Sequence, residues 1–482
     1  MGGSSKHRRN SAPPSVAGGD AVRSTMRGAG LLTTAQVVVG LGNYGYSLML
    51  ARLLAPKLFG NFAAAQGMVL VCGTLATASV PWVVAQVFAT ASGPAARRDV
   101  IWFSLVTNVL QGAVAAVVVV AVTSQFLSTG DAAWAAAAAF AVFVVTTPAG
   151  AFQGDQRFVA LSVLRLVEVA LKVAFGLLLV TAGAGVAGAL AGAALAAALV
   201  AAVGLVIIRH ELRPQRSALR LGHLWRTSLG IVGVQGLVAV LSSLDVVLVG
   251  VLDVDPVAAG SYQASAILGR VPLFLGGSLA TAVYASLARG GSSARAVMAS
   301  VLRTYGFLGL GFLIVLLTAP EPILSLVFPP KYALVNDFLP YTALAGVGIG
   351  AVNVITTWFQ AGAKFRTSIL LQAAALTAAI LLLIVGFALG GLHGLAVAAP
   401  VGPAITAALL LAAARETWPM VATWWRDAGM LALLLAAALL TRAWPPLWMS
   451  VAVLIGIVSL LRLLAVRKEP PRPAVYPPPR SP

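Results

Sequence analysis

The stretch RLLAPKLFGNFAAA, Arg52–Ala65, interrupts a long apolar region with a proline and a glycine that lie close to an arginine and a lysine. A related stretch, LDVDPVAAGSYQASA, Leu252–Ala266, follows about 200 residues later. Both contain the pattern Pro-x-x-x-Gly-x-aromatic-x-Ala, and the corresponding pairs are Pro56 with Pro256 and Gly60 with Gly260. Because proline and glycine favour turns, each copy predicts a turn between two apolar helices. The recurrence predicts an internal duplication.

Two further pairs of segments recur at nearly the same offset. FQGDQRF, Phe152–Phe158, matches FQAGAKF, Phe359–Phe365, and a weaker match joins GVAG, Gly185–Gly188, with GLHG, Gly391–Gly394. Six predicted helices separate the copies. An even number of membrane crossings keeps the two copies in the same orientation, which predicts a parallel repeat about an axis along the membrane normal.

The composition indicates an integral membrane protein. The chain has 482 residues, of which 60% are hydrophobic and 10% are charged, and its mean hydropathy is +0.95. Soluble domains carry about 25% charged residues, and a membrane-spanning helix needs about 20 apolar residues. On this criterion we predict about 14 helices, near residues 29–54, 60–90, 100–124, 131–153, 158–182, 185–208, 227–251, 257–287, 297–319, 335–359, 367–389, 393–414, 428–442 and 447–466.

The sequence therefore predicts an all-α polytopic membrane protein with two six-helix lobes, related as a parallel repeat, and two C-terminal helices. The lobes are expected at 29–208 and 227–414, with a basic cytoplasmic loop at 209–226 between them and helices 13 and 14 at 428–466. A basic, disordered cytoplasmic tail is expected at 1–28 and a proline-rich one at 467–482. The first apolar run is interpreted as a retained helix and not as a cleaved signal peptide.

The distribution of basic residues predicts the orientation. With the N-terminus inside, the inner segments hold about 24 of the 32 lysines and arginines, and the outer loops hold about four. This bias agrees with the positive-inside rule and places both termini in the cytoplasm. The loop Arg209–Arg226 is expected to attract anionic membrane lipids. The net charge of +18 is thereby explained without a nucleic-acid partner.

One predicted helix of the first lobe carries three charges on one face. Arg165, Glu168 and Lys172 lie at i, i+3 and i+7, and Glu168 can pair with either neighbour. A charge at the bilayer centre is costly and is expected to face a cavity or a partner. The face is net positive, which favours an anion site. The alternative is a self-neutralised stripe whose long side chains reach the inner interface.

The second lobe carries charges in two adjacent predicted helices. Asp245 and Arg270 differ in predicted depth by roughly 10 Å at 1.5 Å per residue. Pro272 is expected to bend the second of these helices, which suits a gated cavity. A static salt bridge is the alternative. Together with Arg303, the predicted spans contain four cations and two acids, and this excess of positive charge favours an anionic substrate.

Arg52, at the outer end of the first predicted helix, is interpreted as an anchor at the outer membrane interface.

Several kinds of chemistry are excluded by what the sequence lacks. It contains no nucleotide-binding G-x-x-x-x-G-K-[ST] loop, and its four histidines are widely separated and lack metal-site spacing. The longest predicted outer loop, about Pro320–Val335, leaves little room for an enzyme active site. We therefore predict no cofactor, no metal site and no catalytic residue. A transporter driven by an ion gradient is expected instead of an enzyme.

Three segments resemble one family. LARLLAPKLFGNFAAA is similar to the helix-one signature of the Wzx-type polysaccharide flippases, which transport O-antigen. LSSLDVVLVGVLDVDPVAAGSYQASAILGRVPLFL resembles their seventh and eighth helices, and LRLVEVALKV resembles their fifth. The resemblance covers about residues 28–414. It extends to the multidrug/oligosaccharidyl-lipid/polysaccharide exporter superfamily, which includes lipid II flippases and multidrug exporters.

The resemblance implies a flippase that moves a polyprenyl-pyrophosphate-linked oligosaccharide across the bacterial plasma membrane by alternating access. Cell-surface polysaccharide or lipopolysaccharide synthesis would be the process served, with polysaccharide assembly proteins as further partners. The substrate-binding candidates carried over are Arg165, Glu168, Lys172, Asp245 and Arg270. Alternatives are an exporter of lipid II or drugs, a membrane glycosyltransferase or polymerase, and a scaffold that does not transport.

Overall fold

The computed structural model describes residues 35, 38–78, 81, 84, 93–214, 222–252, 254–288, 291–415 and 425–468. Within these residues the chain is helical and contains no strand, which confirms the predicted fold class. The predicted N-terminal tail, the part of the predicted C-terminal tail beyond Lys468, and residues 215–221 of the predicted inter-lobe loop lie outside the described residues.

The N-terminal lobe begins with helix one, described over residues 38–53. Its other helices are α2 (Pro56–Ala78), α4 (Pro94–Thr123), α5 (Thr129–Gly154), α6 (Phe158–Leu179), the π-helical turn η1 (Val180–Ala184) and α7 (Gly185–Ile207). The segments are mostly apolar because a membrane span must satisfy its backbone hydrogen bonds internally and present apolar side chains to lipid. Polar signals mark the ends: Ser128 caps α5 by accepting from the Asp131 backbone N–H at 3.2 Å.

The C-terminal lobe repeats this order with two broken spans. Its helices are α8 (Gly222–Val251), α9 (Pro256–Gly269), α10 (Val271–Ala288), α11 (Gly291–Thr318), α12 (Glu321–Val327), η3 (Pro330–Tyr332), α13 (Val335–Ala361), α14 (Phe365–Ala398) and α15 (Val401–Ala413). The predicted helix 257–287 is divided into α9 and α10 at Arg270, with φ −90° and ψ 2°. The bend that Pro272 predicted is therefore confirmed. The predicted helix 393–414 consists of the end of α14 and all of α15.

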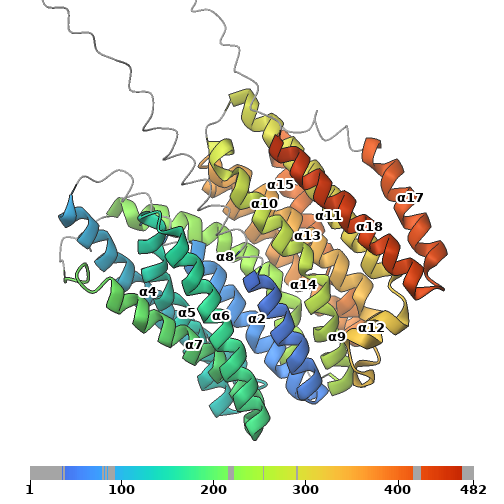
Figure 1. Cartoon of the computed structure of the whole chain (residues 1–482), viewed down its shortest axis with the longest axis horizontal. Coiled ribbons are helices and arrows are strands. Elements are labelled where there is room, and N and C mark those ends of the chain that lie inside the picture. The colour runs from blue at the N-terminus through green and yellow to red at the C-terminus, as the bar shows by residue number, and fades with distance from the viewer. Residues whose placement is uncertain are drawn as a thin grey trace, which may run out of the picture.

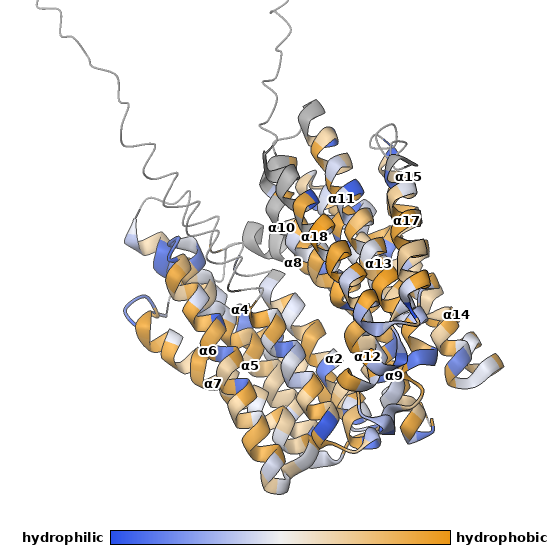
Figure 2. Ribbon diagram, turned by 45° about the vertical axis from the view of Figure 1, so that its right-hand side comes forward, coloured by the Kyte–Doolittle hydropathy of each residue, from blue (hydrophilic) through white to orange (hydrophobic). Residues whose placement is uncertain are grey.

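Two helices follow the second lobe. They are α17 (Trp425–Thr441) and α18 (Pro445–Lys468), which pack on α11. Figure 1 shows them in red on the outer flank of the C-terminal lobe. Eight segments of the described chain are long and apolar enough to cross a membrane, and one of them, Phe158–Ile207, contains two predicted spans. Figure 2 shows apolar residues along the helices and hydrophilic ones mostly near helix ends.

Backbone conformation confirms the internal repeat. Gln156 and Ala363, at matching positions of the second repeat pair, both have positive φ, at 57° and 53°. In each copy the next residue donates its backbone N–H to the phenylalanine five residues earlier, at 2.8 Å, which is a Schellman helix end. The weaker glycine pair also matches, since Gly185 has φ 52° and ψ −131° and Gly391 has φ 57° and ψ −144°.

The two copies of the Pro-x-x-x-Gly motif touch each other where the lobes meet. A Cβ atom placed on Gly260 would lie 2.7 Å from the Pro56 carbonyl oxygen, which only a glycine permits. The lobes contact mainly through α2, which packs against α8 and α9 (Figure 1). At the same end, one apolar cluster joins side chains of both lobes, among them Phe59, Phe62, Phe328 and Tyr332. The lobes are thus tightly closed at the end that carries these turns.

Candidate functional site

The three charged residues of α6 divide into a pair and a single cation. Arg165 Nη1 lies 3.1 Å from Glu168 Oε2, and both side chains are about one-fifth exposed. Glu168 therefore pairs with the arginine one turn before it. This pair matches the self-neutralised alternative of the sequence interpretation and leaves the charge of Lys172 to be explained separately.

Lys172 points toward helix one and contacts neutral groups. Its Nζ donates to Asn43 Oδ1 at 2.9 Å and lies 5.3 Å from the centroid of the Tyr46 ring. The Tyr46 hydroxyl donates to the Ala189 carbonyl on α7 at 3.0 Å, which holds the ring in place. Within the described residues, the ammonium has an amide oxygen and an aromatic face as partners, but no ion pair with a carboxylate. Asn43 was not among the predicted site residues, although a polar side chain in an apolar span could have indicated it.

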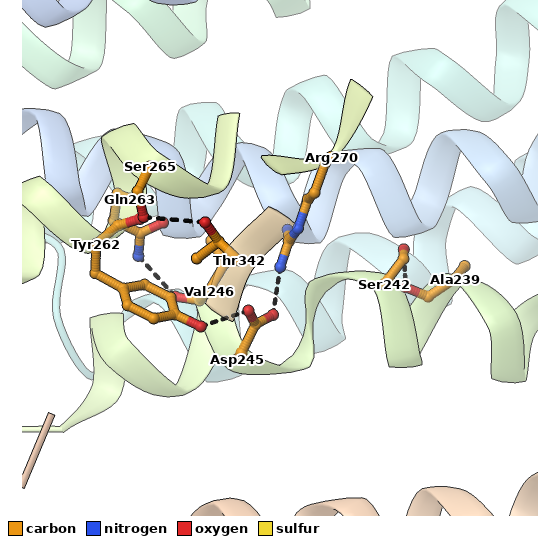
Figure 3. A network of polar contacts seen from close by, with 9 residues as sticks. All are labelled: Ala239, Ser242, Asp245, Val246, Tyr262, Gln263, Ser265, Arg270 and Thr342. Atoms are coloured by element: carbon orange, nitrogen blue, oxygen red, sulfur yellow. Dashed lines mark hydrogen bonds and ion pairs between the residues drawn. The ribbon is translucent and has the colours of Figure 1, made fainter. Parts of the chain in front are cut away.

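In the second lobe, Asp245 accepts from two side chains. Figure 3 shows Arg270 and Tyr262 converging on the buried carboxylate from α9 and its end. Arg270 Nη2 forms an ion pair with Oδ1, and the Tyr262 hydroxyl donates to Oδ2 at 2.6 Å. The predicted difference in depth does not prevent a direct pair, because the helix ends at Arg270 and the long side chain reaches across to α8.

Tyr262 was missed as a candidate, although the repeat contained a signal. It is the aromatic residue of the second Pro-x-x-x-Gly motif, and the first copy has Phe62 at that position. The added hydroxyl, in an apolar region, supplies the second hydrogen bond to Asp245. Gln263 donates to the Val246 carbonyl at 2.8 Å and strengthens the junction of α9 with α8 (Figure 3).

The five candidates therefore form two groups, one in each lobe. No hydrogen bond or ion pair between the described side chains joins one group to the other. Their neighbours do meet: Tyr44, next to Asn43, contacts Phe274, one turn after Arg270, edge to face at 5.7 Å between centroids. A small pocket beside Asp245, lined by residues of α8, α13, α14 and α15, has room for about one water molecule.

Arg303 lies apart from these groups. Its Nε and Nη2 contact the two carboxylate oxygens of Asp427 on α17 at 2.6 and 3.0 Å, and Arg462 of α18 contacts the same carboxylate at 2.5 Å. Arg303 thus helps attach the C-terminal helices and does not add a cation to the candidate site. The five candidate residues still carry one excess positive charge, since they comprise three cations and two acids: Arg165, Lys172 and Arg270 with Glu168 and Asp245.

Arg52 contacts the other lobe. Its Nη2 donates to the Leu326 carbonyl on α12 at 2.6 Å, and the side chain is exposed. The sequence interpretation as an anchor at the membrane interface did not foresee this contact, because nothing in the local sequence indicates which distant loop lies nearby.

The fold and the repeat define a multi-pass membrane protein built like a two-lobed transporter. Over residues 25–290, more than half of the chain, the sequence matches the family described as polysaccharide biosynthesis protein. The chain belongs to this family. No curated protein matches the sequence.

Solved structures share the fold at low sequence identity. The lipid II flippase MurJ, in an inward closed conformation, is similar with a TM-score of 0.68 and 13% identity, over 90% of this chain and 99% of that chain. The eukaryotic MATE transporter AtDTX14 is similar with a TM-score of 0.61 and 14% identity, over 86% and 100%. An inward-facing multidrug resistance MATE transporter of the MOP superfamily has a TM-score of 0.59 and 14% identity, over 81% and 99%. The chain therefore has the fold of these transporters.

Proposed function

We propose that the protein is a flippase that moves an oligosaccharide linked to polyprenyl pyrophosphate from the inner to the outer face of the bacterial plasma membrane. Membership of the polysaccharide biosynthesis protein family supports the polysaccharide role. The fold shared with a lipid II flippase supports a lipid-linked substrate. The product would serve cell-surface polysaccharide synthesis, such as O-antigen export, together with polysaccharide assembly proteins.

The observation that carries this proposal is that the ammonium of Lys172 has no carboxylate partner among the described residues. In the N-terminal lobe, its ammonium is held by an amide oxygen and an aromatic ring, whereas Arg165, Arg270 and Arg303 each have a carboxylate partner. Lysine binds phosphate as a point charge, and a charge in a membrane interior is costly without a partner. A pyrophosphate group would supply the negative charge. Arg270 would bind the same pyrophosphate once its ion pair with Asp245 opens.

The two lobes provide a mechanism. We take 29–208 and 227–414 as the units that rock against each other, with both termini and the basic loop 209–226 in the cytoplasm, near anionic lipids. Closure at the end that carries the Pro56 and Pro256 turns then corresponds to an inward-facing state. An ion gradient is the proposed source of energy, since the sequence contains no nucleotide-binding loop.

Deletion of the gene tests the proposal. A strain without the protein should lose its surface polysaccharide and accumulate a polyprenyl-pyrophosphate-linked oligosaccharide on the inner face of the membrane, identified by mass spectrometry of extracted lipids. Expression of the wild-type chain should reverse both effects. Normal surface polysaccharide in the deletion strain, with no accumulated intermediate, would overturn the proposal.

A second candidate is a lipid II flippase, because the similar MurJ structure covers 90% of this chain. Proteoliposomes that contain the purified protein separate the two. The oligosaccharide-linked lipid should be translocated and should not be displaced by an excess of lipid II. Translocation of lipid II itself, at a comparable rate, would favour the second candidate.

A further inference from the structure

The repeat is asymmetric in the connection at the closed end. Between α4 and α5 of the N-terminal lobe, the connection consists of residues 124–128. The corresponding connection between α11 and α13 runs over residues 319–334 and contains α12 and η3. The second lobe thus carries an extra folded segment, 321–332, at the end where the lobes meet.

This segment caps helix one of the opposite lobe. Lys331 Nζ donates to the carbonyl oxygens of Arg52 at 3.0 Å and Leu54 at 2.5 Å, and the Tyr332 hydroxyl donates to the Ala51 carbonyl at 2.8 Å. The last carbonyls of a helix have no partner within the helix, and a cation is favourable at this negative end of the helix dipole. The second lobe therefore supplies the cap that helix one lacks.

The contact is reciprocal, and its aromatic part is buried. Arg52 of helix one donates in return to the Leu326 carbonyl of α12 at 2.6 Å. The Tyr332 ring is buried and meets Phe59 of α2 edge to face, with the centroids 5.5 Å apart. Partial burial lowers the pKa of Lys331, as expected for an ammonium that has lost part of its hydration.

The repeat-related contact on the other side is apolar. Phe126, in the short connection of the N-terminal lobe, lies against the end of α8, where a Cβ atom on Gly250 would be 3.5 Å from its ring. Its carbonyl accepts from Asn61 of its own lobe at 3.2 Å. No described hydrogen bond or ion pair joins Phe126 to α8, so the polar cap belongs to one side of the interface.

We propose that residues 321–332 form a latch that holds the two lobes together at the outer face, with Lys331 and Tyr332 as its positioning residues. A two-lobed transporter must separate its lobes at this face to release substrate outward, so the latch has to open in each transport cycle. The assignment of this face as the outer one rests on the proposed function. The contacts themselves do not depend on the substrate.

Distance measurement between the lobes tests the latch. Nitroxide labels are placed at Thr129 in the N-terminal lobe and at Leu326 on α12, in a Cys72→Ala background. Both positions are exposed. Pulsed electron resonance in lipid nanodiscs then reports the distance between the two labels. Lys331→Met should raise the ratio of separated to closed molecules by about tenfold or more, because hydrogen bonds from an ammonium are lost. Tyr332→Phe, which keeps the packed ring, should raise the ratio by a smaller factor.

Two controls complete the experiment. Lys331→Arg, which retains a cation, should restore most of the closed population. Lys57→Met, at an exposed lysine on the same face, should leave the distances unchanged. Unchanged distances in both Lys331→Met and Tyr332→Phe would overturn the latch, whether or not the strain still exports polysaccharide. If the distances change as expected but the deletion strain keeps its surface polysaccharide, the proposed function is overturned and the latch remains.

Discussion

At the scale of single residues, the candidate site consists of cations that differ in how their charge is compensated. Arg165 and Arg270 have carboxylate partners at close range, and Lys172 is held by Asn43 and the Tyr46 ring. A half-buried cation with neutral partners can bind an anion without first breaking an ion pair. Lys172 is therefore the residue on which anion binding should depend most directly.

Replacement of Lys172 tests this expectation. Lys172→Met removes the charge and keeps much of the apolar length, and it should lower polysaccharide export by about tenfold or more, since a hydrogen bond to a charged group contributes about 1.5–3 kcal/mol. Lys172→Arg should retain a substantial part of the activity. Surface polysaccharide in a complemented deletion strain is the measurement, with membrane insertion checked by immunoblot. Equal export by the methionine variant and wild type would remove Lys172 from the site.

The pair of Asp245 and Arg270 allows a double-substitution test. Asp245→Ala leaves a buried arginine uncompensated and should lower the free energy of unfolding by about 3–5 kcal/mol, measured in detergent. The variant that also carries Arg270→Ala should recover most of that loss. Export should remain absent in the double variant if Arg270 contacts substrate. Recovery of export together with stability would instead identify the pair as a static salt bridge.

At the scale of elements, two spans of the C-terminal lobe owe their shape to local breaks. α9 and α10 separate at Arg270, directly before Pro272. α14 turns at Gly390 and Gly391, and the repeat-related turn between α6 and α7 uses Gly185. The first break sets where Arg270 leaves the helix and reaches Asp245, so the broken element positions part of the candidate site.

The two glycines in α14 make a matched pair for measuring the cost of that turn. Gly391 has φ 57° and ψ −144°, whereas Gly390 has φ −141° and ψ 20°, and neither has a neighbouring atom within 4 Å of an added Cβ. Gly391→Ala should lower stability by about 1–3 kcal/mol, because only glycine adopts that conformation readily. Gly390→Ala should have a clearly smaller effect. Comparable melting temperatures for the two variants would contradict the assignment of strain to Gly391.

At the scale of the whole molecule, the closed end depends on the duplicated motif and on the latch together. Gly260 approaches the Pro56 carbonyl so closely that an added Cβ would lie 2.7 Å from it, whereas a Cβ on Gly60 would lie 3.6 Å from Gly260 N, an ordinary contact. The repeat is therefore not symmetric at the point where its two copies meet.

This asymmetry predicts different effects of the same substitution in the two lobes. Gly260→Ala should push the lobes apart and increase the separated population between labels at Thr129 and Leu326. Gly60→Ala should leave that distribution close to wild type. An increase of the same size in both variants would show that the contact at Gly260 does not limit closure.

Much of the architecture could be predicted because it depends on local sequence. The apolar lengths placed the helices, and the recurrence of the motif around Pro56 and Pro256 predicted two lobes in the same orientation. The partners of the charged residues could not be predicted in the same way. Arg303 contacts Asp427, which lies 124 residues later in the chain, and Arg52 contacts Leu326, which lies 274 residues later.

The sequence by itself thus determined that the chain is a duplicated, multi-pass helical membrane protein, because membrane insertion depends on hydropathy and turn residues that act within a few positions. Only the tertiary structure decided which charges are compensated, that Tyr262 shares Asp245 with Arg270, and that Lys331 caps helix one. These contacts depend on how the helices of the two lobes pack. Their energies come from atoms that are distant in the chain and a few ångströms apart in space.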